Sequence, residues 1–118
     1  LLSHDAPACF ASLSARVGSI TDNQLGGWYS YRASKAAQNQ FLRTFAIEAQ
    51  RRAPNLTVLT LHPGTTDTGL SKPFQKNVPA EKLFTAEYVA GQLLDLVFTR
   101  PASDSGSFLA WDGSAIAW

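Results

Sequence analysis

The chain has 118 residues, ten basic and nine acidic side chains, and a formal net charge of +1. Hydrophobic residues make up 45% of it and charged residues 16%, which excludes a disordered tail, a collagen-like chain and a highly charged solvating segment. A net charge this close to zero also lacks the basic patch that nucleic-acid binding needs, so no nucleic-acid partner is expected.

The cellular setting is predicted from what the sequence lacks. Cys9 is the single cysteine, so an internal disulfide is impossible and a reducing, cytoplasmic compartment is expected. No apolar run approaches the roughly 20 residues that cross a bilayer, so no membrane partner is expected. The chain starts at Leu1 and contains no methionine, which indicates a processed chain or a fragment.

The first two thirds of the chain alternate between strand and helix signals. Residues 8–15 are small and apolar and predict a buried strand, and the glycines of residues 16–30 mark a loop. Residues 31–52 hold neither proline nor glycine and predict a long helix, buried on more than one side because apolar residues cover most of it. Residues 56–61 predict a strand covered on both faces, and residues 65–84 a long excursion.

The last third continues the alternation. Thr85 is a suitable N-cap for a helix that runs to about Thr99, and residues 106–111 predict a third strand. The order strand, helix, strand, helix, strand predicts an α/β fold with a parallel sheet and helices on its faces. Functional residues should then lie beyond the carboxyl ends of the strands.

Tyr31 and Lys35 form the sharpest chemical signal at these strand ends. Residues four apart at the start of a helix lie on one face, one turn apart. An ammonium near a phenol favours the phenolate, so the pKa of Tyr31 should fall below its usual value of about 10. Such a phenol can act as a general acid or base. YxxxK taken alone is more often a solvated helix face, but its place after a glycine loop favours the catalytic reading.

The surrounding residues resemble a known family. Residues 28–37, WYSYRASKAA, are similar to the YxASKAA hallmark of the short-chain dehydrogenase/reductases. In order, residues 14–20 resemble the family's serine segment after its fifth strand, residues 63–68 its PGxxxT segment, and residues 111–113 the DG that closes its seventh strand. The segments VGSITDN and GGWYSYRASK are particularly similar to the C-factor-like subgroup. The resemblance covers about residues 8–118 but only the C-terminal half of a family member.

The resemblance implies a Rossmann-type parallel sheet, here strands five to seven, and an oxidoreductase that transfers hydride between NAD or NADP and a small carbonyl or alcohol substrate. Tyr31 would give or take the proton, and Lys35 would hold the ribose hydroxyls of the nicotinamide half and lower the Tyr31 pKa. The remaining cofactor-binding residues that it implies are Pro63, Gly64, Thr65, Thr66 and Thr68. Taken alone, the Pro63–Gly64 pair would only be a turn that ends a strand.

The serine segment departs from the family. Aligned on Gly18, the position of the catalytic serine is Ala15. Ser14 precedes it, and strand alternation points it to the other face; Ser19 lies just beyond the strand. Either hydroxyl could donate a hydrogen bond to the reacting oxygen if the geometry permits. The alternative is that Ser14 only satisfies backbone groups.

Other residues carry weaker signals. His4 and His62 are far apart and lack acidic or cysteine companions at metal spacing, so no metal site is expected. His62 could line a pocket, or it could be a hydrogen-bonded turn histidine. The apolar residues of the excursion could form a mobile substrate lid or merely anchor a surface loop; they are Leu70, Phe74 and Phe84.

A dinucleotide site needs a glycine-rich turn for the pyrophosphate, and the sequence contains no GxGxxG. Residues 1–118 are therefore expected to form a single partial domain that lacks the N-terminal, cofactor-phosphate half. Strand 8–15 would then keep an unpaired edge and an uncovered apolar face, and the chain would be poorly soluble or self-associate unless a complementary piece is present. Two alternatives remain: a non-catalytic binding or signalling module on the same fold, or an inactive fragment. A homo-oligomer through helix 31–52 is also expected.

Overall fold

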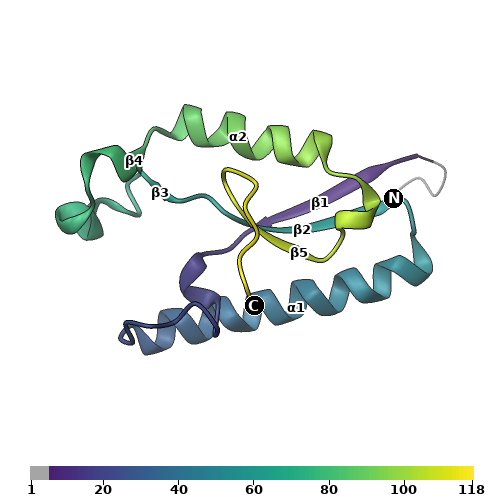
Figure 1. The fold of residues 1–118 in the computed structure, drawn as a ribbon, viewed down its shortest axis with the longest axis horizontal. Coiled ribbons are helices and arrows are strands. Elements are labelled where there is room, and N and C mark those ends of the chain that lie inside the picture. Colours follow the sequence, from purple (N-terminus) through teal and green to yellow (C-terminus); the bar gives the residue numbers. More distant parts are fainter. Residues whose placement is uncertain (1–5) are drawn as a thin grey trace.

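A computed structural model describes residues 6–118 as three layers, with a parallel sheet between two helices (Figure 1). The sheet consists of β1 (Ala8–Leu13), β2 (Leu56–His62) and β5 (Ser107–Ala110) in the order β1-β2-β5. Both pairings are parallel, so β2 is the central strand and the three carboxyl ends meet at one edge. This confirms the predicted fold class.

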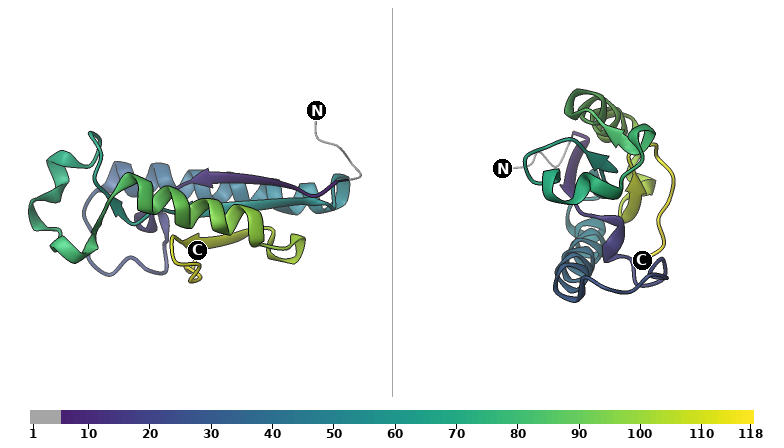
Figure 2. Two further views of the ribbon diagram at one scale, coloured as in Figure 1. Left: turned by 90° about the horizontal axis from the view of Figure 1, so that it is seen from above. Right: turned by 90° about the vertical axis from the view of Figure 1, so that its left-hand side faces the viewer.

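Two helices cover opposite faces of the sheet, α1 (Tyr29–Arg52) on one and α2 (Ala86–Thr99) on the other (Figures 1 and 2). Helix α2 begins as predicted, because the side chain of Thr85 accepts a hydrogen bond from the backbone N–H of Tyr88 at 3.2 Å. Helix α1 begins at Tyr29, earlier than predicted, directly after three residues with positive φ.

The core follows the alternation of β2. Its odd and even side chains face different helices, so residues 56–61 are all buried, as predicted for a strand covered on both faces. On the α1 side, Leu56 and Val58 pack against Ala46 and Ala49. On the other side Leu59 and Leu61 pack against Leu96 and Leu109. A third cluster joins β5 to the C-terminal tail through Phe108, Ala110 and Ile116.

The excursion between β2 and α2 is closed on itself. Strand β3 (Thr65–Thr66) pairs in parallel with β4 (Leu83–Phe84), and two short 3₁₀ turns, Lys72–Asn77 and Ala80–Lys82, lie between them. The excursion projects beyond the carboxyl ends of the strands (Figure 1). It is therefore placed where the functional residues were expected.

Two burial predictions are wrong for the described residues. Helix α1 is covered by the sheet on one side only, and Ala33, Ala37 and Phe41 are exposed, Phe41 by 77%. Strand β1 was predicted to be buried, but Phe10 and Leu13 are about half exposed because β1 has only β2 as a neighbour. The outer edge of β1 is therefore unpaired within residues 6–118, and the exposed Phe10 and Leu13 agree with the uncovered apolar face expected for this strand in a partial sheet. No helix in that range is long and apolar enough to cross a membrane.

Candidate functional site

The Tyr31–Lys35 pair lies at the start of α1, one turn apart. The Tyr31 side chain is 47% exposed. The Lys35 Nζ donates to Gln38 Oε1 at 3.0 Å, and the Gln38 amide donates to Ser12 Oγ at 3.0 Å and to the Leu13 carbonyl at 2.9 Å. Gln38 therefore connects Lys35 by hydrogen bonds to the carboxyl end of β1, where the sequence predicted functional residues.

Trp28 connects Tyr31 with the excursion. Its φ of 52° and ψ of 42° lie in the left-handed region, which is strained for a bulky residue. Backbone strain of this kind clusters at functional sites. The indole ring meets the Tyr31 ring at 6.3 Å and the Phe74 ring at 6.4 Å between centroids, both in edge geometry. The sequence motif contained Trp28 but did not reveal this role, because no pattern signals a positive φ at a tryptophan.

Ser14 is buried against α1. Its hydroxyl donates to Asn39 Oδ1 at 2.5 Å, and the Asn39 side chain is itself only 3% exposed. The Nδ2 of Asn39 has no hydrogen-bond partner among the described residues. A serine hydroxyl has one proton, so the Ser14 proton is committed to the asparagine in this arrangement.

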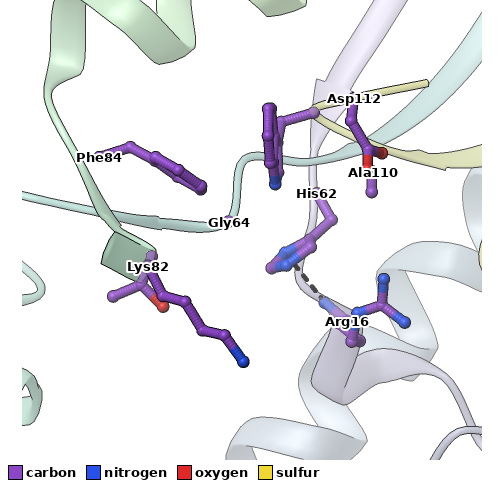
Figure 3. A pocket seen from close by; sticks show the side chains of 9 residues that line it. Arg16, His62, Gly64, Lys82, Phe84, Ala110 and Asp112 are labelled. Carbon is purple, nitrogen blue, oxygen red and sulfur yellow. Dashed lines mark hydrogen bonds between the residues drawn. The ribbon is translucent and has the colours of Figure 1, made fainter. Parts of the chain in front are cut away.

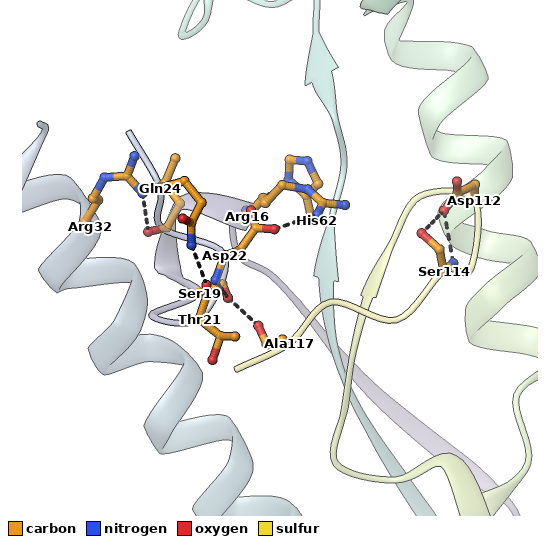
Figure 4. Close-up of polar contacts among 11 residues, drawn as sticks. Arg16, Ser19, Thr21, Asp22, Gln24, Arg32, His62, Asp112, Ser114 and Ala117 are labelled. Carbon is orange, nitrogen blue, oxygen red and sulfur yellow. Dashed lines mark hydrogen bonds and ion pairs between the residues drawn. The ribbon is translucent and has the colours of Figure 1, made fainter. Parts of the chain in front are cut away.

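The Ser19 hydroxyl is hydrogen-bonded to the C-terminal tail. Its side chain is 1% exposed, and Oγ donates to the Ala117 carbonyl at 2.5 Å while accepting from the Asp22 N–H at 3.0 Å (Figure 4). The Thr21 N–H also donates to the Trp118 carbonyl at 3.1 Å. Ser19 thus closes the loop after β1 onto the tail.

Residues 63–68 follow the end of β2. Gly64 has a φ of +73°, and a Cβ there would lie 2.9 Å from Phe84 Cε2, so only glycine fits without strain. The Thr66 hydroxyl donates to the Pro63 carbonyl at 3.5 Å, and Thr68 Oγ1 accepts from a backbone N–H at 3.4 Å. Among residues 6–118 no hydrogen bond or ring contact joins this segment directly to Tyr31.

His62 combines the two roles that the sequence left open. The backbone N–H of Arg16 donates to its Nδ1 at 3.2 Å, and the ring also lines a pocket (Figures 3 and 4). Burial and, to a smaller extent, the Arg16 guanidinium together lower the pKa of His62 to about 4, although the Asp22 and Asp112 carboxylates oppose the shift. His62 is therefore neutral at pH 7, and because Nδ1 accepts, Nε2 carries the proton.

This pocket has a volume of about 270 Å³ and lies at the carboxyl ends of the strands. Phe84 and Trp111 form its aromatic wall, with ring centroids 4.5 Å apart and Tyr88 packed against both. Phe84 is thus anchored, whereas Leu70 and Phe74 of the excursion are largely exposed. No group of metal-binding side chains occurs within residues 6–118; His4 lies outside the described residues.

Comparisons with known proteins show which proteins the chain resembles. The chain is 37% identical over 107 residues to 1-hydroxy-2-glutathionyl-2-methyl-3-butene dehydrogenase of Rhodococcus sp. (strain AD45), covering 90% of the chain and 45% of that protein. It is 32% identical over 108 residues to C-signal of Myxococcus xanthus, covering 92% and 60%. NADPH-bound carbonyl reductase from chicken fatty liver superposes with a TM-score of 0.78 at 30% identity, over 94% of the chain and 43% of that protein. The chain resembles the C-terminal half of a short-chain dehydrogenase/reductase.

Further comparisons agree with this likeness. A short chain dehydrogenase from Burkholderia cenocepacia J2315 in complex with NADP superposes with a TM-score of 0.63 at 25% identity, over 92% of the chain and 46% of that protein. No protein-family model matches the sequence. The chain spans about half the length of the curated relatives it matches. The sequence motifs predicted a resemblance to the short-chain dehydrogenase/reductases and to their C-factor-like subgroup. These comparisons confirm that resemblance.

The short-chain dehydrogenase/reductase pattern makes Ala15 the notable departure. Ala15 is half-buried and has an extended backbone, with φ −148° and ψ 146°. It has a methyl group where the family pattern has a hydroxyl. The neighbouring hydroxyls of Ser14 and Ser19 point to other partners.

Proposed function

We propose that this chain forms the substrate and nicotinamide end of an NAD(P)-dependent oxidoreductase of the short-chain dehydrogenase/reductase type, with Tyr31 as the acid or base. The observation that carries the proposal is the Tyr31–Lys35 pair on one face of α1, held at the carboxyl end of β1 by Gln38. The names of the similar proteins, a dehydrogenase and an NADPH-bound carbonyl reductase, support the same class of reaction.

The residues present suit the nicotinamide half of the cofactor. The Lys35 ammonium has three donors and uses one of them on Gln38, so two remain for the ribose hydroxyls. The exposed Tyr31 hydroxyl is free to give a proton to a carbonyl oxygen or to take one from an alcohol. When bound, the nicotinamide would supply or accept the hydride. The segment Pro63, Gly64, Thr65, Thr66 and Thr68 would lie against it.

The cofactor phosphates need groups that this sequence does not provide. It has no glycine-rich turn that would receive a pyrophosphate at a helix N-terminus. We therefore propose that residues 1–118 are one partial domain of a longer protein. The unpaired edge of β1 and the exposed Phe10 and Leu13 support this, because a further strand would pair the edge and cover both side chains.

The test uses the full-length protein that carries this chain, assayed with NADPH and NADH against a panel of aldehydes and ketones. Tyr31→Phe should lower kcat by about 100-fold or more with little effect on cofactor affinity, since it removes only the proton donor. Tyr29→Phe is the matched control, because Tyr29 is exposed on the same helical turn and should keep full activity. Absence of turnover, or equal activity of Tyr31→Phe and the parent, would refute the proposal.

We also propose that a second copy of the protein packs on α1. Ala33, Ala37 and Phe41 recur every four residues and form an exposed apolar stripe on the helix, away from the sheet. Phe41→Glu should convert the oligomer to a smaller species in analytical ultracentrifugation, whereas Gln40→Glu beside it should not. An unchanged sedimentation coefficient for Phe41→Glu would remove this proposal.

A second candidate function is a binding module without catalysis. It is favoured by the commitment of both serine protons, Ser14 to Asn39 and Ser19 to Ala117, and by the methyl group of Ala15. Under this reading the intact protein binds nicotinamide cofactor weakly or not at all in calorimetry. Under the oxidoreductase reading, Ala15→Ser should raise kcat, because it restores a hydroxyl that can donate to the reacting oxygen. Absence of nicotinamide cofactor binding by the intact protein in calorimetry would favour the binding module.

A further inference from the structure

The pocket beside His62 contains hydrogen-bond donors that the proposed proton transfer does not use. His62 lies between Arg16 and Lys82 (Figure 3), and the aromatic wall of Phe84 and Trp111 lines the same pocket. Its Nδ1 is occupied by the Arg16 N–H, so its Nε2–H is the free donor of the ring. Neither this Nε2–H nor the Lys82 ammonium has a hydrogen-bond partner among the described residues.

Each acidic group near the pocket has a partner on one of its carboxylate oxygens. Asp22 accepts from the Arg16 guanidinium at 3.4 Å, which leaves further guanidinium donors. Asp112 accepts from the backbone N–H of Ser114 at 3.0 Å and from its hydroxyl at 2.6 Å. Oδ2 of Asp112 accepts no hydrogen bond among the described residues, but the lining holds two cationic side chains, Arg16 and Lys82, against this one carboxylate, and the excess positive charge favours an anionic oxygen ligand.

The shape of the pocket restricts the ligand further. The wall made by Phe84 and Trp111 offers tilted aromatic faces to a flat or apolar body. One neutral imidazole donor and two long cations, one of them shared with Asp22, suit a single negative charge better than a phosphate dianion. A volume of about 270 Å³ accommodates a small organic acid.

We propose that this pocket binds the carboxylate of an organic acid, with His62 Nε2–H and the Lys82 ammonium as donors and Phe84 and Trp111 holding its apolar body. The substrate is then a carbonyl or alcohol compound that also carries a carboxylate. The statement that the acid is a substrate rests on the proposed function. Binding of the acid does not require turnover.

The binding experiment uses the intact protein and two probes of equal shape, 4-methylbenzoate and its neutral counterpart 4-methylbenzamide. The benzoate should shift the imidazole NMR signals of His62 and bind at least tenfold more tightly than the amide, because it adds charge-assisted hydrogen bonds. Lys82→Met should remove most of this preference. Lys76→Met is the matched control, since Lys76 lies on the same excursion but does not line the pocket.

The pH dependence of benzoate binding distinguishes the two kinds of donor. His62 is neutral above about pH 5, so its own titration leaves the affinity level between pH 6 and pH 8; the other charged groups that face this site are Arg16, Lys82, Asp22 and Asp112. Affinity that falls as pH rises through 6.5 would mean that a protonated histidine binds the anion, and the assignment of a neutral donor would be wrong.

A turnover experiment separates this inference from the proposed function. With NADPH, 4-carboxybenzaldehyde should be reduced with a higher kcat/KM than 4-formylbenzamide, and Lys82→Met should equalise the two through KM. Benzoate binding without any turnover would refute the oxidoreductase and retain the acid pocket. Turnover with equal kcat/KM for both aldehydes, together with equal binding of benzoate and amide, would overturn the acid pocket and retain the oxidoreductase.

Discussion

The pKa of His62 leads to a quantitative prediction about stability. Protonation of Nδ1 would turn the acceptor of the Arg16 N–H into a second donor, and it would place a buried positive charge beside the Arg16 guanidinium. The folded state therefore favours the neutral ring, and the pKa is about 4 against an ordinary value of 6.5. Because one pKa unit corresponds to about 1.4 kcal/mol, the neutral ring contributes about 3 kcal/mol to the free energy of unfolding.

The sign of this contribution sets the pH range. A group whose folded-state pKa is lowered in this way stabilises the fold fully above 6.5, and the stabilisation is lost as pH falls from 6.5 towards 4. His62→Asn keeps an acceptor for the Arg16 N–H but has no proton to gain. The variant should therefore lose less stability than the parent over this range, by about 3 kcal/mol at most.

The assay is urea unfolding of the full-length protein and of His62→Asn at pH 7.5 and at pH 4.5. Comparing the pH-induced changes of the two proteins cancels the titration of all other groups. An NMR titration of the His62 ring gives the pKa directly, and the signal missing in His62→Asn identifies it. A His62 pKa near 6.5, or identical pH-induced losses in the two proteins, would falsify the electrostatic reasoning.

Substitutions at three further positions test individual contacts. Gly18→Ala should destabilise the protein by about 1–3 kcal/mol in urea unfolding, because a Cβ would lie 2.8 Å from the backbone carbon of Lys35; unchanged stability would contradict this packing. Thr85→Ala should lower the free energy of unfolding by about 1 kcal/mol because it removes the N-cap of α2, whereas Thr85→Ser keeps a capping hydroxyl and should retain most of this stability. Gly64→Ala should cost about 2 kcal/mol, from its φ of +73° and the 2.9 Å approach to Phe84, and a thermal melt equal to that of the parent would exclude such strain.

The strand and helix order could be read from the sequence because its signals are local. Glycine and proline bound each element, and the β-branched run of residues 56–61 requires a strand buried on both sides. The Thr85 cap depends on residues three apart and was predicted correctly. The start of α1 was not, because the last of the three positive φ angles before it lies at Trp28, and only glycine signals such an angle in a sequence.

Burial depends on partners that lie far away in the chain, so it was predicted less well. Phe10 and Phe41 have the character of core residues, and the sequence pattern treats them as buried. In the described residues they are exposed, because no element of residues 6–118 lies over the outer edge of β1 or the outer face of α1. Hydrophobicity shows that a side chain is suited to burial, whereas the surrounding fold decides whether it is covered.

The candidate site divides in the same way. By itself the sequence determined that Tyr31 and Lys35 share a helix face, since the period of an α-helix requires it. Only the tertiary structure decided the roles of the polar groups around them, because their partners are distant in sequence: Asn39 lies 25 residues from Ser14, His62 46 from Arg16, and Ala117 98 from Ser19. A hydroxyl donates its proton to the acceptor that the fold brings within reach, and an imidazole titrates according to its burial, so neither property is contained in local sequence.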